Sequence, residues 1–244
     1  MSGHSKWSQI KHKKAITDSK KSKIFSRLGR EIAIVVREGG PDSATNFKLK
    51  AVIDKAKQYN LPQANIDRII SKSAGQDDGQ KLENLLIEAY GPDGSAFLIT
   101  SITDNRNRTI SEVRNIITKN GGKPAAEGSV AWLFRHYGKI SIPIKEKNKE
   151  EAELIAIEQN AEEIDSNEDY VTILTKPELL YITKDAFTSS GFDVEECLLV
   201  YVPVNPIVPE NPETKKRIAN LLNALDDHDD VQEVVTNTET DETD

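Results

Sequence analysis

The chain has 244 residues, of which 37% are hydrophobic and 30% charged, and its formal net charge at pH 7 is −8. This length predicts two or three compact domains. No run approaches the about 18 apolar residues of a membrane span, and the single cysteine, Cys197, has no partner for a disulfide or a thiolate metal cluster. The composition therefore argues against a membrane protein or a disulfide scaffold, and it favours a cytoplasmic protein with Cys197 buried.

Positive charge is concentrated at the N-terminal end. Residues 1–75 hold 16 basic and 6 acidic side chains, a net charge of +10, which leaves −18 for the remainder. Exposed charges more than about 8 Å apart are largely screened at physiological salt, so the acidic remainder does not cancel the basic end. We predict nucleic-acid contacts from the basic cluster and its aromatic neighbours. These residues are His4, Lys6, Trp7, Lys11, His12, Lys13, Lys14, Lys20, Lys21, Lys23, Arg27 and Arg30.

Three helices are predicted around and after this basic segment. Apolar residues recur at helical spacing in three stretches that are separated by Gly-Gly-Pro-Asp and by a proline suited to a first helical turn. The stretches are residues 24–38, 43–59 and 62–75. The pattern predicts a small three-helix bundle.

The next part of the chain has the pattern of β structure. Two strands, at residues 82–89 and 96–103, flank a Tyr-Gly-Pro-Asp-Gly turn. A helix begins after Asp104 and ends at Asn120-Gly121-Gly122. Residues 130–135 are predicted to form a further strand.

From residue 139 onward, the predicted order is strand, helix, strand, strand, helix, strand. This order is typical of a ferredoxin-like domain, a four-stranded antiparallel sheet with two helices on one face. The segments are residues 140–144, 149–159, 161–165, 170–174, 177–190 and 194–203. A final helix at 213–225 and a strand at 231–236 cannot form a core alone, so we predict that they complete the earlier sheet.

The predicted fold class is therefore α+β and multidomain, with an N-terminal three-helix bundle and two α+β domains, the ferredoxin-like one inserted into the other. The predicted boundaries are a basic arm at 1–22, the bundle at 23–78, a discontinuous α+β domain at 79–137 and 204–238, the inserted domain at 138–203 and an acidic tail at 239–244.

The chemistry of the basic arm favours phosphate binding without base readout. A solvated, solubilising tail needs no tryptophan, whereas Trp7 can stack on a base; anchoring of Trp7 onto the bundle is the alternative. Lysine suits phosphate oxygens, while base edges in DNA are mostly bound by Arg, Asn or Gln. Ribosomal RNA is therefore favoured over operator DNA. A DNA-binding transcriptional regulator is the alternative, and a protein-interaction adaptor that uses the acidic surface is a third.

A second contact is predicted where the 96–103 strand meets the following helix. Free backbone N–H groups at the helix start, with Asn105, Arg106, Asn107 and Arg108, can hold a phosphate or RNA. Capping of the helix by Asp104 or Asn105, with both arginines solvated, explains the same residues.

The sequence predicts no enzyme. No nucleophile with its base, phosphate-cradling glycine loop or pair of catalytic carboxylates is recognisable, so we predict no catalytic residue, cofactor or small-molecule substrate. Residues 226–230 combine four aspartates with His228, yet a solvated acidic turn explains them better than a metal site. His136 is expected to be structural.

Several sequence blocks together resemble the YebC/PmpR family over nearly the whole chain. They are Gly3-His4-Ser5-Lys6-Trp7, Ile10-Lys11-His12-Lys13-Lys14, Lys23-Ile24-Phe25, Arg37-Glu38-Gly39-Gly40, Tyr90-Gly91-Pro92, Thr103-Asp104-Asn105-Arg106-Asn107-Arg108-Thr109, Glu127-Gly128-Ser129-Val130 and Asp229-Asp230-Val231-Gln232. One departure is Lys123-Pro124-Ala125-Ala126, where relatives usually continue with an Asn-Leu-Gly type sequence.

The resemblance implies the same three-domain architecture that the patterns predict. For function, it implies either a DNA-binding transcriptional regulator or a ribosome-associated translation factor that aids elongation through difficult stretches such as consecutive prolines. Mitochondrial relatives resemble translational activators. The translation factor is the leading hypothesis, because it agrees with the lysine-rich arm.

Overall fold

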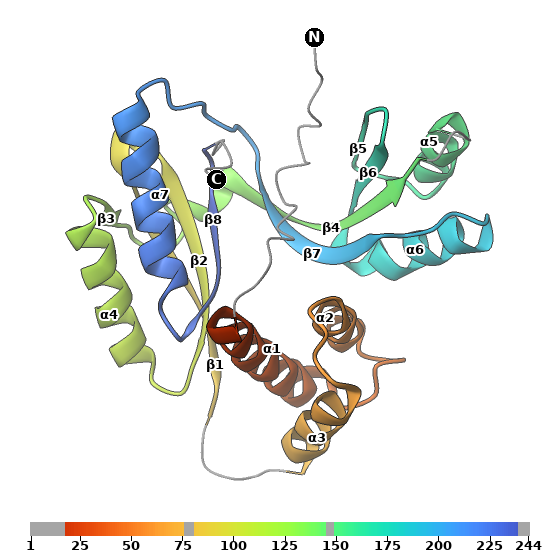
Figure 1. Cartoon of the computed structure of the whole chain (residues 1–244), viewed down its shortest axis with the longest axis horizontal. Helices are drawn as coiled ribbons and strands as arrows, with labels where there is room; N and C mark the ends of the chain where they lie inside the picture. Colours follow the sequence, from red (N-terminus) through yellow and green to blue (C-terminus); the bar gives the residue numbers. More distant parts are fainter. Residues whose placement is uncertain (1–17, 76–80, 145–148, 239–244) are drawn as a thin grey trace.

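The computed structural model describes residues 18–75, 81–144 and 149–238. It consists of a helical bundle and two α+β units, each built on a four-stranded sheet (Figure 1). The second sheet lies between the third and fourth strands of the first in chain order, so the fold class predicted above, with one domain inserted into another, is confirmed. Among the described segments, no helix combines the length and apolar character needed to cross a membrane.

The bundle comprises α1 (Asp18–Gly39), α2 (Phe47–Gln58) and α3 (Gln63–Ala74). Its core is formed by the predicted apolar faces, with Leu28, Ile32 and Leu49 among the buried side chains. Helix α2 begins four residues later than predicted because Asn46 caps it. The Asn46 side chain accepts a hydrogen bond from the Leu49 N–H and donates to two carbonyls of the α1 end, which fixes the α1–α2 turn.

The first sheet, sheet A, contains β1 (Glu83–Tyr90), β2 (Ala96–Thr103), β3 (Lys123–Pro124) and β8 (Val231–Thr236) in the order β3-β1-β2-β8. Helices α4 (Arg106–Lys119) and α7 (Pro212–Asp226) lie together on one side of it (Figure 1). Apolar residues of both helices, including Val113 and Leu221, pack against Ile87 and Ile99 of the strands. The C-terminal helix and strand therefore complete sheet A, as predicted.

The second sheet, sheet B, contains β4 (Phe134–Pro143), β5 (Glu163–Ser166), β6 (Tyr170–Thr175) and β7 (Glu196–Pro203) in the order β5-β6-β4-β7. Every pairing is antiparallel. Helices α5 (Lys149–Glu158) and α6 (Leu180–Ser189) pack on one face, where the buried side chains include Ile140, Val171 and Phe187. This arrangement is ferredoxin-like.

The strand predicted at residues 130–135 is wrong for its first four residues. Residues 130–135 do not form a strand of their own. Instead, a 3-10 turn spans Ala131–Leu133, and β4 begins only at Phe134 and continues through the next predicted strand. The reason is Glu88, whose carboxylate accepts the N–H groups of Val130 and Ala131, so these groups are not free to join a strand ladder.

The bundle also packs against the inserted domain. Ala51 of α2 is buried among apolar residues of sheet B and α6. The Tyr181 hydroxyl donates to Asp54, Lys184 forms an ion pair with the same carboxylate at 3.2 Å, and Lys50 lies 4.1 Å from the centre of the Tyr181 ring. Helix α2 is thus held on the inserted domain by apolar, ionic and cation–π contacts.

Gly138 tests how tightly α6 packs on β4. A Cβ at this position would lie 2.9 Å from two carbons of Leu180 and 3.2 Å from a methyl of Thr175. We expect Gly138→Ala to lower the free energy of unfolding by about 1–3 kcal/mol through overpacking. Gly29→Ala, inside α1 with only Ile69 at 3.4 Å, is the matched control and is expected to raise it by up to about 1 kcal/mol. Urea denaturation measures both; equal effects would contradict the packing argument.

Candidate nucleic-acid interface

The structure covers only part of the predicted basic cluster. Seven of its residues lie outside the described ranges: His4, Lys6, Trp7, Lys11, His12, Lys13 and Lys14. Lys20 belongs to the first turn of α1, but its side chain is not described. The structure therefore places four members, Lys21, Lys23, Arg27 and Arg30, all of them on α1.

Three of these cations face the turn between α7 and β8. Lys23 and Arg27 are four residues apart and therefore lie on one side of α1. The Lys23 ammonium lies 3.4 Å from a carboxylate oxygen of Asp227, and the Arg27 guanidinium lies 2.8 Å from that of Asp226 and also donates to the Asp226 carbonyl. The predicted solvated turn at residues 226–230 is confirmed for Asp226 and Asp227, whose side chains stay mostly exposed although they pair with α1, and it is wrong for Asp230, which is buried.

Arg30 continues this contact into a buried cluster around Asp230. One Asp230 oxygen accepts from Arg30 at 2.8 Å, and the other accepts from Thr109 at 2.7 Å, Arg108 at 3.0 Å and Thr103 at 3.2 Å. Burial opposes ionisation of Asp230, but these hydrogen bonds and the charges of the two arginines outweigh it, so the pKa of Asp230 lies below its usual value. The carboxylate joins the bundle to sheet A and α4.

Lys21 is the remaining described cation of the basic cluster. It is exposed, and its ammonium lies 5.7 Å from the centre of the Phe25 ring. Of the four cations that the structure places, Lys21 is the exposed one, and the other three are partly buried.

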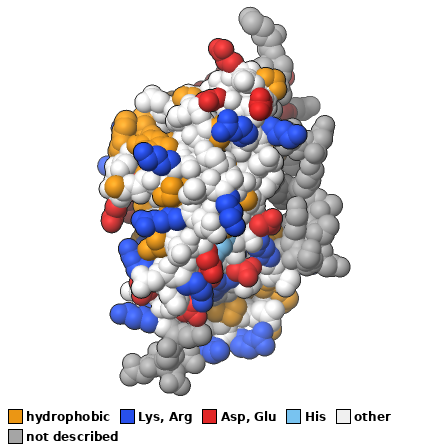
Figure 2. All heavy atoms as spheres, turned by 90° about the vertical axis from the view of Figure 1, so that its left-hand side faces the viewer, with side chains coloured by type: hydrophobic (Ala, Val, Ile, Leu, Met, Phe, Trp, Pro, Cys, Tyr) orange, Lys and Arg blue, Asp and Glu red, His pale blue; other side chains and the backbone are white. Residues whose placement is uncertain are grey.

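The second predicted contact folds as a helix cap. The Asn105 side chain accepts from the Arg108 N–H at 3.1 Å, and Arg108 forms ion pairs with Asp104 at 2.9 Å and with Asp230. Arg106 and Asn107 are exposed. Figure 2, which looks onto the α4 and α7 side, shows Lys and Arg side chains interspersed with acidic ones rather than a continuous basic patch. The cap alternative accounts for Asn105 and Arg108.

Two buried carboxylates were not singled out by the sequence patterns. Asp230 stood within an acidic run, and Glu88 within a predicted strand, yet Glu88 is only 3% exposed and accepts three backbone N–H groups. Alternation along β1 puts Glu88 on the face opposite Leu85 and Ile87, where an acidic residue is ordinary, so its burial left no signal in the sequence. The partners of Asp230 come from segments more than a hundred residues away and leave no local pattern.

His136 and Cys197 are held in packing contacts inside the protein. The His136 ring stacks on Tyr201 with centres 4.6 Å apart, and burial and the charge of Lys48 lower the pKa of His136. Burial raises the pKa of the Cys197 thiol to about 11, which keeps it protonated at neutral pH. Across residues 18–75, 81–144 and 149–238, no three His, Cys, Asp or Glu side chains are grouped so as to hold a metal ion.

These features define a three-domain α+β protein in which a basic helix is joined to an acidic body. Comparison with known protein families supports this architecture. The family described as "TACO1/YebC protein N-terminal domain" matches residues 5–76, and that described as "TACO1/YebC second and third domain" matches residues 82–238. The chain belongs to the TACO1/YebC family.

Relatives match over most of their length. A protein of Aquifex aeolicus named "Probable transcriptional regulatory protein" is 43% identical over 99% of this chain and 97% of its own. A protein of Fervidobacterium nodosum with the same name is 44% identical over 85% of this chain and 82% of its own length. The crystal structure of a conserved hypothetical protein from Aquifex aeolicus has a TM-score of 0.83 at 42% identity, covering 97% of this chain and 98% of that one.

Asp230→Asn tests the buried cluster. The substitution keeps one oxygen that can accept from the threonines but replaces the other with an NH2 donor and removes the charge that pairs with two arginines, so we expect a loss of about 2 kcal/mol in the free energy of unfolding at pH 7. The native carboxylate has a lowered pKa, so its contribution is present above its unfolded pKa and is lost as the pH falls through the lower folded value. The difference between variant and parent should therefore shrink in acid.

Urea denaturation at several pH values between neutral and strongly acidic measures this effect. Asp229→Asn, at the exposed neighbouring position, is the matched control and should change stability little. A difference between Asp230→Asn and the parent that stays constant across this pH range would contradict the assigned role of the charge.

Proposed function

We propose that this protein is a nucleic-acid-binding regulator of gene expression whose basic arm, continued by Lys21 of α1, contacts phosphates. The observation that carries the proposal is the charge distribution: the first 75 residues have a net charge of +10 against −18 for the rest. Such a segment attracts a polyanion by Coulomb forces and by release of condensed counterions. The name of the relatives, which refers to regulation, supports the same general function.

The use of arginine within the protein favours a target recognised by shape. Arg27 and Arg30, the two arginines of the predicted basic cluster, and Arg108 are engaged with acidic groups of the chain itself, so these three guanidinium groups are not free for base edges. The arm supplies mainly lysines, which bind backbone oxygens. Structured RNA is recognised largely through its phosphates and shape, and we therefore propose ribosomal RNA as a target.

In this version the protein is a ribosome-associated translation factor. From the family resemblance we propose that the protein acts during translation elongation, when the ribosome passes through consecutive prolines. No chemistry of its own is required, because a factor that holds the reacting groups in position lowers the barrier entropically.

A DNA-binding transcriptional regulator is the second candidate function. The name "Probable transcriptional regulatory protein" carried by the relatives supports it directly, more than it supports the ribosomal version. It would use the same arm on the DNA backbone. Sedimentation of the intact protein with ribosomes, beside promoter occupancy in cells, separates the two: occupancy of specific promoters without ribosome association would overturn the ribosomal version.

Neutralising the arm tests the shared mechanism. We expect the triple variant Lys11→Gln, Lys13→Gln and Lys14→Gln to weaken binding to ribosomes or DNA, and to flatten the dependence of log affinity on log salt by up to about one unit per lysine. Binding is measured across a salt series.

The matched control for the arm removes the same charge elsewhere. Lys149, Lys176 and Lys216 are exposed on the acidic domains, and their change to Gln should leave the salt slope nearly unaltered. Deletion of residues 1–22 tests the alternative that the protein is a protein-interaction adaptor. That alternative predicts that the truncated protein still binds its protein partner. If the control and the arm variant behaved alike, local contact by the arm would be refuted.

A further inference from the structure

Trp132 is the most exposed large apolar side chain of the described residues, at 69%. It belongs to the 3-10 turn that precedes β4. Its indole N–H donates to the Ser129 carbonyl at 2.9 Å, which fixes the ring relative to its own loop. With its donor already used, the indole has only its aromatic surface left to offer a ligand.

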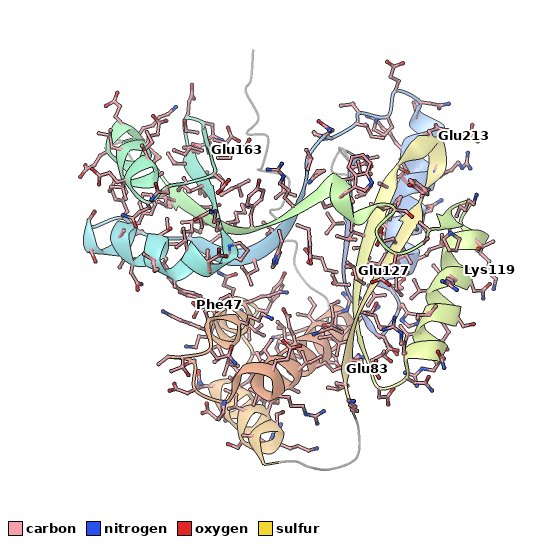
Figure 3. All side chains as sticks on the ribbon, turned by 180° about the vertical axis from the view of Figure 1, so that it is seen from behind. Phe47, Glu83, Lys119, Glu127, Glu163 and Glu213 are labelled. Atoms are coloured by element: carbon pink, nitrogen blue, oxygen red, sulfur yellow. The ribbon has the colours of Figure 1, made fainter. Side chains whose placement is uncertain are left out.

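The loop that carries Trp132 is held rigidly by Glu88. The buried carboxylate accepts the N–H of Gly128 at 2.6 Å and that of Ala131 at 2.8 Å, in addition to that of Val130. Gly128 has φ +80°, a conformation that suits glycine, and the loop also pairs with β1 through the Ala125 N–H at 2.9 Å. Figure 3 labels Glu127 in this loop, beside the strands of sheet A. A ring presented by such a loop loses little conformational entropy on binding.

A second aromatic ring and a cation lie beside it. Tyr90 is 39% exposed, and its hydroxyl donates to the same Ser129 carbonyl at 3.0 Å, so both aromatic side chains converge on one atom. Lys123 is the direct cross-strand partner of Tyr90, which puts the two side chains on the same face of sheet A, and it is exposed. Tyr90 and Glu88 share one face of β1, opposite the face that packs on α4 and α7.

We propose that Trp132 and Tyr90 form a stacking platform for an unpaired nucleobase, with Lys123 binding the adjoining phosphate. The proposal rests on the proposed function, since it assumes that nucleic acid reaches this face. Aromatic faces with a neighbouring cation are the chemistry of single-strand binding, and they accept any base because every base has a π face. Of the carboxylates around the platform, Glu88 is buried and accepts three backbone N–H groups, whereas Glu127 of the same loop is exposed, so the phosphate is assigned to the Lys123 side.

A protein partner would also use an exposed tryptophan, and Val204, 41% exposed, is brought near by the hydrogen bond from its N–H to the Leu133 carbonyl. The cation opposite Tyr90 favours the nucleic acid. The other strongly exposed apolar residues of the described chain include Leu154 and Ile182 on α5 and α6, in the other α+β domain, so Trp132 is not part of that surface.

The platform can be tested by fluorescence, because the chain has two tryptophans and Trp7→Phe leaves Trp132 as the sole reporter. The probes are a single-stranded RNA of about 12 nucleotides, the DNA of the same sequence, the duplex, and an abasic oligomer of equal length. We expect both single strands to quench Trp132 emission, and the duplex and abasic oligomer to leave it unchanged. A preference between the two single strands distinguishes RNA from DNA as the source of the base.

Affinity measurements on the full chain give the second readout. We expect Trp132→Ala to bind the single strand about 5- to 150-fold more weakly, the loss of one base–aromatic stack, and Trp132→Phe to retain most of the affinity. Ile182→Ala, at a 60% exposed apolar position on α6, is the matched control and should bind like the parent. Circular dichroism verifies that each variant is folded.

The outcomes separate the platform from the arm. Unchanged single-strand affinity in Trp132→Ala, or equal quenching by the abasic oligomer, overturns the platform while phosphate binding by the arm stands. No binding of any oligomer or of ribosomes by the parent overturns the proposed function and the platform together. A shift of Trp132 emission with protein concentration alone, without oligomer response, identifies the surface as a protein contact and also overturns the platform.

Discussion

The carboxylate of Asp230 is the contact on which the arrangement of the domains depends. It is 7% exposed and lies where α1, α4 and the start of β8 meet. An isolated charge in such a place is strongly unfavourable, but two guanidinium groups and two hydroxyl groups supply donors to both of its oxygens. The cost of burying this charge is thereby offset only when all three elements are in position, so the contact specifies the orientation of the bundle as well as contributing stability.

The contact between α1 and the α7–β8 turn divides the described cations of the N-terminal segment into two groups. Lys23, Arg27 and Arg30 form ion pairs with Asp226, Asp227 and Asp230, at the end of α7 and in the turn that follows. Lys21, near the start of α1, is exposed and adjoins the basic residues that precede the helix in sequence. Under the proposed function, a nucleic acid would meet mainly lysine, which attracts phosphates with little base discrimination, and specificity would then come from the shape of the target or from a separate contact.

Glu88 is a second buried carboxylate whose oxygens are satisfied by donors, on the face of sheet A opposite α4 and α7. A buried carboxylate there accepts backbone N–H groups in place of side-chain cations, and it converts an irregular loop into a fixed support for Trp132. Both sites use a charge inside the protein to position groups at its surface. In each case the surrounding donors make the arrangement stable, because an ionised carboxylate with unsatisfied oxygens would not remain buried.

The sequence by itself determined the elements and their grouping, because hydrophobic periodicity is local. Strands β2 and β8 coincide with their predicted limits, and the ferredoxin-like order and the return of the C-terminal segment follow from the same patterns. Only the tertiary structure decided which charged side chains are paired within the protein and which remain exposed to solvent. Arg27 and its partner Asp226 are 199 positions apart, and an ion pair has no periodic signature that sequence spacing could display. The start of β4, four residues later than predicted, was likewise decided by Glu88, from a strand some forty residues earlier, because a carboxylate can withdraw backbone N–H groups from a ladder without any local sequence signal.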